Sequence, residues 1–159
     1  MKQRGCFAIL CRVKKIEFIA RAVCVKNGMM LLCQNKGKRH AYLPGGHIEH
    51  GERAAGALAR EIREELGLAA KVGRFIGCAE NCFMQGGRKV AEINLVFEAA
   101  VPKISPRKNP AATEPHLEFF WHPLDSLATS SLQPAALRAL IPQWLQHPGF
   151  SSSGEGWGA

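Results

Sequence analysis

Short apolar runs with the two-residue period of β-strands recur along this chain, separated by turn residues. Asn27-Gly28 is a strong turn signal, because both residues tolerate the positive φ angles of a tight hairpin. A glycine-containing hairpin loop is expected at 81–89, and a proline-rich loop at 102–115. The pattern predicts strands over residues 16–25, 29–33, 70–78, 90–101 and 119–121.

Two further segments predict helices. Ala, Leu, Arg and Glu, which favour helix, fill residues 52–66, and Gly67 follows where a C-cap glycine is expected. A closing helix is predicted over 134–145, where Pro142 is expected to strain it or to end it early. The side of the first helix that is predicted to pack on a sheet consists of Ala55, Leu58, Ala59, Ile62 and Leu66.

Three carboxylates share one side of the first predicted helix. Glu61, Glu64 and Glu65 stand at i, i+3 and i+4, and such positions are neighbours on a helix surface. Like charges so placed repel one another by roughly 0.2–0.5 kcal/mol per pair. A hard divalent cation such as Mg²⁺ or Mn²⁺ reverses the sign, because it binds carboxylate oxygens. The alternative is a solvated acidic face that Arg60 and Arg63 neutralise.

The spacing around these carboxylates favours the metal site. From Gly46 to Leu68 the sequence reads GHIEHGERAAGALAREIREELGL, which fits G-x5-E-x7-R-E-U-x-E-E-x-G-U with U apolar. All nine fixed positions are met in a frame of 23 residues. The chain therefore resembles the Nudix hydrolases over about residues 16–145, and this motif, the Nudix box, is the specific part of the resemblance.

The resemblance implies a fold and a reaction. The fold is an α/β/α sandwich with a mixed β-sheet. The reaction is metal-dependent hydrolysis of a pyrophosphate bond in a nucleoside diphosphate that is linked to another moiety. Arg60 is expected to orient the box glutamates, and Glu52 to pair with it. The alternative for these two residues is an ion pair with a purely structural role.

The resemblance also implies a set of metal ligands. Glu61 and Glu65 are expected to bind Mg²⁺ or Mn²⁺ directly, and a carbonyl of the glycine turn, here that of Gly45, is expected to join them. Glu64 is expected to bind a second ion or to act as the general base. Some members of the family use a glutamate outside the box for that purpose, and Glu114 is the first candidate here.

Several residues outside the box are candidates for substrate binding. Glu118 is a second candidate for the glutamate outside the box. For the basic residues a solvated surface is the competing interpretation, and for the acidic strand residue it is pairing with a nearby base. The substrate candidates are Lys36, Lys38, Arg39, Arg88 and Glu92.

The formal net charge of +8 is unevenly spread. Residues 46–68 hold five acidic and three basic side chains, whereas the rest of the chain holds 18 basic and eight acidic ones. An acidic pocket in a basic body suits a metal site that attracts a polyanion. Nucleic-acid binding is compatible with this charge but is not favoured, because no RNA-recognition signature or aromatic stacking array accompanies it.

The six cysteines form no C-x-x-C pair, and neither a signal peptide nor a membrane-spanning run is recognisable. We expect reduced thiols in a cytoplasmic protein that does not enter membranes. The predicted organisation is an N-terminal extension or extra strand at 1–15, a Nudix domain at 16–147 and a flexible tail at 148–159. A homodimer is compatible with the sequence.

The moiety attached to the diphosphate stays open. A nucleoside triphosphate, ADP-ribose or a nucleotide sugar all fit, since the residues after the box carry no marker of a subfamily. Two alternatives are a catalytically silent nucleotide-binding regulator with the same fold and an RNA 5′-end pyrophosphohydrolase. Hydrolysis is favoured over the regulator because the box retains all of its glutamates.

Overall fold

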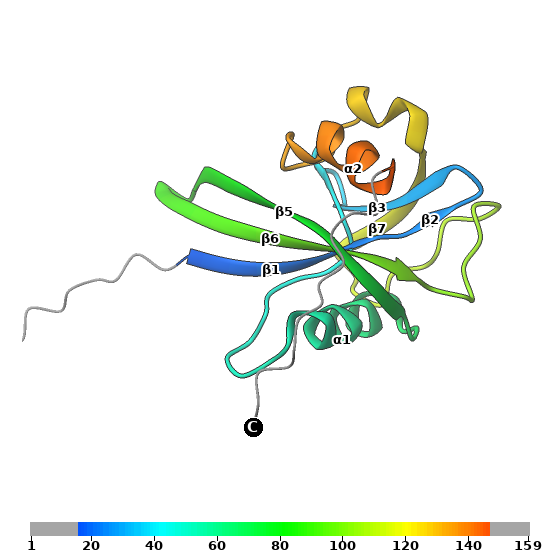
Figure 1. Cartoon of the computed structure of the whole chain (residues 1–159), viewed down its shortest axis with the longest axis horizontal. Coiled ribbons are helices and arrows are strands. Elements are labelled where there is room, and N and C mark those ends of the chain that lie inside the picture. The colour runs from blue at the N-terminus through cyan, green and yellow to red at the C-terminus, as the bar shows by residue number, and fades with distance from the viewer. Residues whose placement is uncertain (1–15, 147–159) are drawn as a thin grey trace, which may run out of the picture.

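The structure is a computed structural model that describes residues 16–146 (Figure 1). The predictions for segments 1–15 and 148–159 concern residues outside this range. The elements in chain order are β1 (Ile16–Val23), β2 (Val25–Lys26), β3 (Met29–Asn35), β4 (Ala41–Tyr42), α1 (Ala54–Leu66), β5 (Lys71–Gln85), β6 (Arg88–Ala100), β7 (Leu117–Pro123), the 3₁₀-helix η1 (Leu124–Thr129) and α2 (Leu137–Gln146).

The strands form two sheets between the helices. In the first sheet the order is β1-β6-β5, with β1 parallel and β5 antiparallel to β6, so this sheet is mixed. In the second sheet β3 pairs antiparallel with β2, β4 and β7. Helix α1 lies on one side of the strands and α2 on the other (Figure 1). The predicted α/β/α sandwich with a mixed sheet is confirmed.

Strand β1 contributes to a hydrophobic core on each side. Ala20 and Ala22 belong to the cluster that contains Leu58 and Ile62 of α1, whereas Val23 belongs to the cluster that contains Ile141 of α2. Successive side chains of a strand point to opposite faces, so one strand can anchor two layers. Both faces of β1 are therefore fixed, and so is its register against β6.

The hairpin of β5 and β6 is longer than predicted. The expected loop at 81–89 is wrong, because the two strands stay paired as far as Gln85 and Arg88. The turn consists only of Gly86-Gly87, whose φ angles of 55° and 75° suit a two-residue hairpin turn. The hairpin consequently projects beyond both helices (Figure 1).

Helix α1 begins two residues later than predicted. Arg53 has the extended backbone of an N-cap residue (φ −78°, ψ 139°), and Glu52 therefore precedes the helix instead of lying in its first turn. The C-terminal prediction is confirmed, because Gly67 adopts the left-handed conformation with φ 66°. Ala57 is buried in this helix, whereas Ala55 of the predicted apolar side is exposed.

The expected early end of the last helix is wrong. Helix α2 continues through Pro142 to Gln146. Proline removes one backbone donor, but Leu137 and Ile141 before it are both 0% exposed, and the indole of Trp144 after it lies against Gly77. Packing on both sides of the proline thus holds the helix. No helix within residues 16–146 has the length and apolarity needed to cross a bilayer.

The four cysteines within residues 16–146 form no disulfide. Cys24 and Cys33 are buried and Cys78 and Cys82 are exposed, and burial raises the pKa of the Cys33 thiol to about 12. Because the thiolate is the nucleophile, we expect iodoacetamide at pH 8 to modify Cys78 and Cys82 of the folded protein and to spare the two buried thiols. Peptide mass spectrometry measures this. Equal labelling of Cys33 before unfolding would contradict the burial of β3.

Candidate active site

A turn of Leu43–Gly46 lies along the edge of β1. The amide of Ala22 donates to the Pro44 carbonyl and that of Ala20 to the Gly46 carbonyl, both at 2.9 Å. Gly45 has φ +120°, and a Cβ at this position would overlap the carbonyl oxygen of Ala20. Only glycine therefore fits where the turn approaches the strand most closely.

Glu65 projects from the buried side of α1 toward this turn. Its side chain accepts a hydrogen bond from the Gly45 amide at 3.0 Å, and the residue is only 7% exposed. Burial raises the pKa of Glu65 to about 7, and the nearby carboxylates of Glu61 and Glu114 act in the same direction. The Gly45 hydrogen bond and the Arg21 charge oppose this shift. The site thus contains a buried carboxylate with two others close by.

Arg60 gathers the remaining acidic residues of the box. Its guanidinium binds both oxygens of Glu52 at 3.0 Å and donates from Nη1 to Glu61 at 2.9 Å and to Glu64 at 3.0 Å. It also donates to the His47 carbonyl at 3.0 Å, beside the glycine turn. Hydrogen bonding to Arg60 lowers the pKa of Glu52. Arg60 therefore links the chain before α1, the turn and the acidic side of the helix.

The Glu61 carboxylate packs directly on the turn. A Cβ on Gly46 would overlap its oxygens, so the second glycine leaves the room that this carboxylate occupies. Glu61 and Glu65 consequently both contact the glycine turn, at Gly46 and at the Gly45 amide, whereas the side chain of Glu64 is 51% exposed.

The donor set fits a hard divalent cation. All candidate ligands are oxygens, and one is a buried carboxylate, which a cation would stabilise. Within residues 16–146, no three acidic, His or Cys side chains already converge as a ligand cluster. Arg60 holds Glu61 and Glu64, while Glu65 faces the Gly45 amide.

The loop before β7 brings Glu114 to the site. The amide of Thr113 donates to the Glu65 backbone carbonyl at 2.7 Å, which fixes this loop against α1. Glu114 pairs with His116 at 3.3 Å. Glu118 instead accepts a hydrogen bond from Gln34 at 2.7 Å across the β3–β7 pair. Of the two candidate glutamates outside the box, Glu114 is thus the one that lies near Glu65, whereas Glu118 lies in β7.

The predicted basic residues have different surroundings. Lys36 binds the loop of Glu114 twice, through its ammonium group to the Pro115 carbonyl at 2.6 Å and through its amide to the His116 carbonyl at 2.9 Å. Lys38 and Arg39 are exposed in the loop that follows. Arg88 lies at the end of the projecting hairpin, six residues or about 20 Å along the strand from Asn94, and is not brought to the turn.

Glu92 lies on the sheet and is half-buried. Its carboxylate accepts hydrogen bonds from the amides of Asn81 at 3.3 Å and Asn94 at 3.4 Å. Among residues 16–146, no basic side chain lies within salt-bridge distance of Glu92. Glu92 instead belongs to a polar group on β5 and β6 that continues toward the glycine turn through Arg21.

Sequence reasoning missed Arg21 and Asn94. Arg21 is a single basic residue in the apolar strand β1, and Asn94 is a single amide in the apolar part of β6 that is 0% exposed. Their side chains meet at 3.4 Å although 73 positions separate them. One basic side chain and one amide within largely apolar stretches were the available signal, and the register of β1 against β6 supplies the partner.

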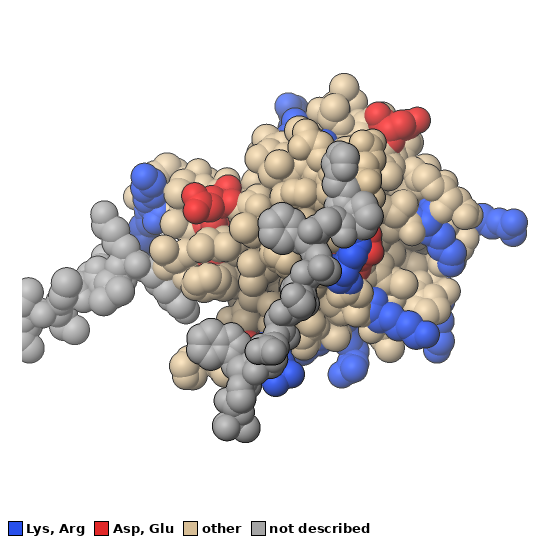
Figure 2. Space-filling view, viewed as in Figure 1, with Lys and Arg blue, Asp and Glu red and all other residues tan. Residues whose placement is uncertain are grey.

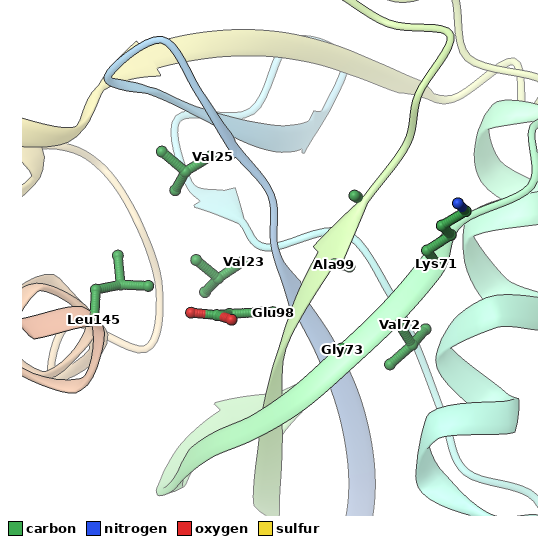
Figure 3. Close-up of a pocket in the computed structure, with 9 residues that line it drawn as sticks. Val23, Val25, Lys71, Val72, Gly73, Glu98, Ala99 and Leu145 are labelled. Carbon is green, nitrogen blue, oxygen red and sulfur yellow. The ribbon is translucent and has the colours of Figure 1, made fainter. Parts of the chain in front are cut away.

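A cavity of about 430 Å³ lies elsewhere, between the first sheet and the end of α2. Val23, Val25 and Glu98 point into it toward Leu145, away from α1 (Figure 3). Neither the glycine turn nor any acidic residue of α1 lines this cavity. It is therefore separate from the candidate active site.

The basic side chains do not form a single surface on the face seen in Figure 2. Lys and Arg are most numerous there along the right and lower edge, while one group lies near the middle and another at the end of the projecting hairpin. Other residues separate these groups on this face.

Comparison with known proteins agrees with the geometry. A family model described as the NUDIX domain matches residues 17–145. Diphosphoinositol polyphosphate phosphohydrolase 2 of Rattus norvegicus is 34% identical over 70 residues, or 40% of this chain and 39% of that protein. CTP pyrophosphohydrolase of Escherichia coli (strain K12) is 37% identical over 68 residues, or 40% of this chain and 50% of that protein.

The chain spans at most half the length of these curated relatives in the matched regions. Among solved structures, the MutT protein from Methanosarcina mazei Go1 is similar, with a TM-score of 0.65 at 23% identity over 86% of this chain and 98% of that one. The fold is thus shared over nearly the whole described region. Because the family model covers most of the sequence, the chain belongs to the NUDIX domain family of hydrolases.

Proposed function

We propose that this protein is a divalent-metal-dependent hydrolase of phosphoanhydride bonds in nucleoside diphosphate derivatives. The observation that carries the proposal is the buried Glu65 carboxylate at the glycine turn, with Glu61 beside it. A carboxylate that is 7% exposed and has no basic partner within salt-bridge distance among residues 16–146 is costly, and a bound cation offsets that cost.

The proposed ligands are Glu61, Glu65 and the Gly45 carbonyl, with Glu64 at the exposed edge. Mg²⁺ or Mn²⁺, when bound, would neutralise charge on the diphosphate and acidify the attacking water. Arg60 would hold the carboxylates in place through the hydrogen bonds described above. These bonds orient the ligands without requiring Arg60 to touch the substrate.

Glu64 and Glu114 are the two candidates for the general base. Each carboxylate is partly exposed, at 51% and 37% of its side chain, and can therefore meet a water molecule. Lys36 would keep the Glu114 loop in place through its contacts with Pro115 and His116. Lys38 and Arg39 are exposed and remain proposed contacts for the substrate.

The relatives suggest which compounds to test. Their names state action on diphosphoinositol polyphosphates and on CTP, which share a phosphoanhydride bond. A panel should contain nucleoside triphosphates, ADP-ribose, nucleotide sugars, a diphosphoinositol polyphosphate and 5′-triphosphorylated RNA. Each compound is assayed with Mg²⁺, with Mn²⁺ and with excess EDTA.

We expect hydrolysis of at least one compound with metal, none with EDTA, and about a 100-fold loss of kcat in Glu61→Gln. The substitution keeps the shape but removes the charge of a proposed ligand, and losing such an electrostatic contact typically costs this much. Glu80→Gln, which changes an exposed carboxylate on β5, is the matched control and should retain full activity.

Two results would contradict the proposal. Activity that survives EDTA would exclude a metal mechanism. An inactive protein that still binds nucleotides would favour the regulator instead.

A further inference from the structure

Among residues 16–146, no carboxylate lies within salt-bridge distance of Arg21. Arg21 lies in β1 between Ala20 and Ala22, which are 0% and 1% exposed. A partly buried guanidinium is expensive unless its donors are used. Its hydrogen bonds therefore indicate what it does.

Those bonds give a partner to the two carbonyls of the glycine turn that do not bond to the backbone of β1. The carbonyls of Pro44 and Gly46 point to β1 and accept from its backbone amides at 2.9 Å. The two alternate carbonyls, of Leu43 and Gly45, both accept from Nη1 of Arg21, at 3.1 Å and 2.6 Å. Because alternate carbonyls of an extended chain point in opposite directions, the backbone of β1 cannot reach this second pair.

Gly45 is consequently held on both sides. Its amide donates to Glu65 at 3.0 Å, and its carbonyl accepts from Arg21 at 2.6 Å. A carbonyl oxygen has two lone pairs, so one hydrogen bond leaves it able to bind a cation. Arg21 thus fixes the direction of the only proposed ligand that comes from the backbone.

Asn94 fixes Arg21 in turn. Its side-chain oxygen accepts from Nε of Arg21 at 3.4 Å, and the residue is fully buried in β6. Its amide nitrogen donates to Glu92 at 3.4 Å. The guanidinium is therefore tied to the sheet at one end and to the glycine turn at the other.

We propose that Arg21 is a positioning residue of the metal site, which aims the Gly45 carbonyl and is itself anchored by Asn94. This inference rests on the proposed function, because it assumes that the site takes a divalent cation. Hydrogen-bond partners of metal ligands typically change metal affinity about 10- to 100-fold when they are removed.

The test compares Arg21→Met with wild type in two measurements that need no substrate. Mn²⁺ affinity is measured by electron paramagnetic resonance, and exchange of the Gly45 amide by NMR in metal-free protein. We expect Mn²⁺ binding about 10- to 100-fold weaker. We expect Gly45 exchange about 10-fold faster, with the amides of α1 unchanged. A loss of global stability alone would accelerate both sets of amides.

Arg74→Met is the matched control, since Arg74 lies on the same sheet and pairs with Glu98 at 2.7 Å, away from the turn. It should leave Mn²⁺ affinity unchanged. Arg21→Lys keeps a donor near the carbonyls but loses the Asn94 contact, so it should bind Mn²⁺ with intermediate affinity.

Folded Arg21→Met with Mn²⁺ affinity within twofold of wild type would overturn the inference. If Arg21→Met does not fold, the Mn²⁺ affinities of Arg21→Lys and Asn94→Leu provide the test. Wild-type affinity in both variants would equally overturn the inference. A wild type that binds no Mn²⁺ is a separate outcome. It refutes the proposed function, and with it this role, before any variant is compared.

Discussion

Glu65→Gln should abolish hydrolysis and at the same time stabilise the metal-free protein above neutral pH. We expect kcat to fall about 1,000-fold, since removing the charge of a proposed direct ligand forfeits several kcal/mol of transition-state stabilisation. Glutamine keeps an oxygen that can accept from the Gly45 amide, so the turn should stay in place. Steady-state kinetics with saturating Mg²⁺ measures the first effect.

The gain in stability follows from the environment of the same carboxylate. Burial raises the pKa of Glu65 from 4.5 to about 7. Its contribution to the free energy of unfolding is therefore fully present below about pH 4.5 and is lost as the pH rises through about 7. At pH 9 the ionised wild-type side chain costs about 3 kcal/mol, at 1.36 kcal/mol per pKa unit. Glutamine has no such loss.

Urea unfolding in EDTA at pH 5 and pH 9 measures this difference. We expect nearly equal stabilities at pH 5 and a more stable variant at pH 9. An exposed carboxylate gives a matched control, and Glu80→Gln should show no comparable dependence on pH. A variant that is less stable than wild type at both pH values would contradict this expectation. It would show that the folded protein stabilises the ionised Glu65 carboxylate, for example through the hydrogen bond from the Gly45 amide.

Gly45→Ala should destabilise the protein by about 3 kcal/mol or more and remove activity. The φ angle of +120° is strained for any L-residue, and the new Cβ would overlap the Ala20 carbonyl oxygen and crowd Leu58. Backbone strain and overpacking cost about 1–3 kcal/mol each. The overlap is with backbone, so no rotamer change relieves it. Chemical denaturation and a hydrolysis assay measure both effects.

Gly56→Ala is the paired substitution for this test. Gly56 lies inside α1, and an added Cβ there would meet no atom within 4 Å apart from its chain neighbours and the backbone of its own helix. Alanine there should stabilise the protein by about 0.5–1 kcal/mol. A loss of stability in Gly45→Ala and a gain in Gly56→Ala would confirm that the space around the added Cβ and the backbone φ angle determine the effect. Equal tolerance would mean that the turn can move away from β1.

Local backbone chemistry explains which parts of the fold the sequence predicts. The Asn27-Gly28 turn and the Gly67 cap follow from residues that accept positive φ, and both are present. The hairpin loop was overestimated because Gly86-Gly87 and the polar residues around them favour a loop, and residues 81–85 are mostly exposed. Pairing with β6, rather than burial, keeps them extended.

Some residues of the candidate site could likewise be predicted from the sequence, and others could not. The box frame predicts the carboxylates of α1, and the contact of Glu52 with Arg60 is present, although Glu52 precedes the helix. The partners of Arg21 could not be predicted, because they depend on the register of β1 against β6 and on the path of the glycine turn. The relative positions of side chains on one helix follow from their spacing in the sequence. Contacts between strands depend on the tertiary fold.

The ion pairs of Arg60 with three carboxylates also bear on whether the protein folds before or after it binds metal. Many small metal-binding domains, such as zinc fingers, fold only when the ion binds. Here the Arg60 guanidinium already balances part of the acidic charge on α1. We therefore expect the newly made chain to complete its fold in a metal-poor environment. A divalent cation at the proposed site would then compete with the Arg60 guanidinium for carboxylate oxygens of Glu61 and Glu64 that Arg60 already holds.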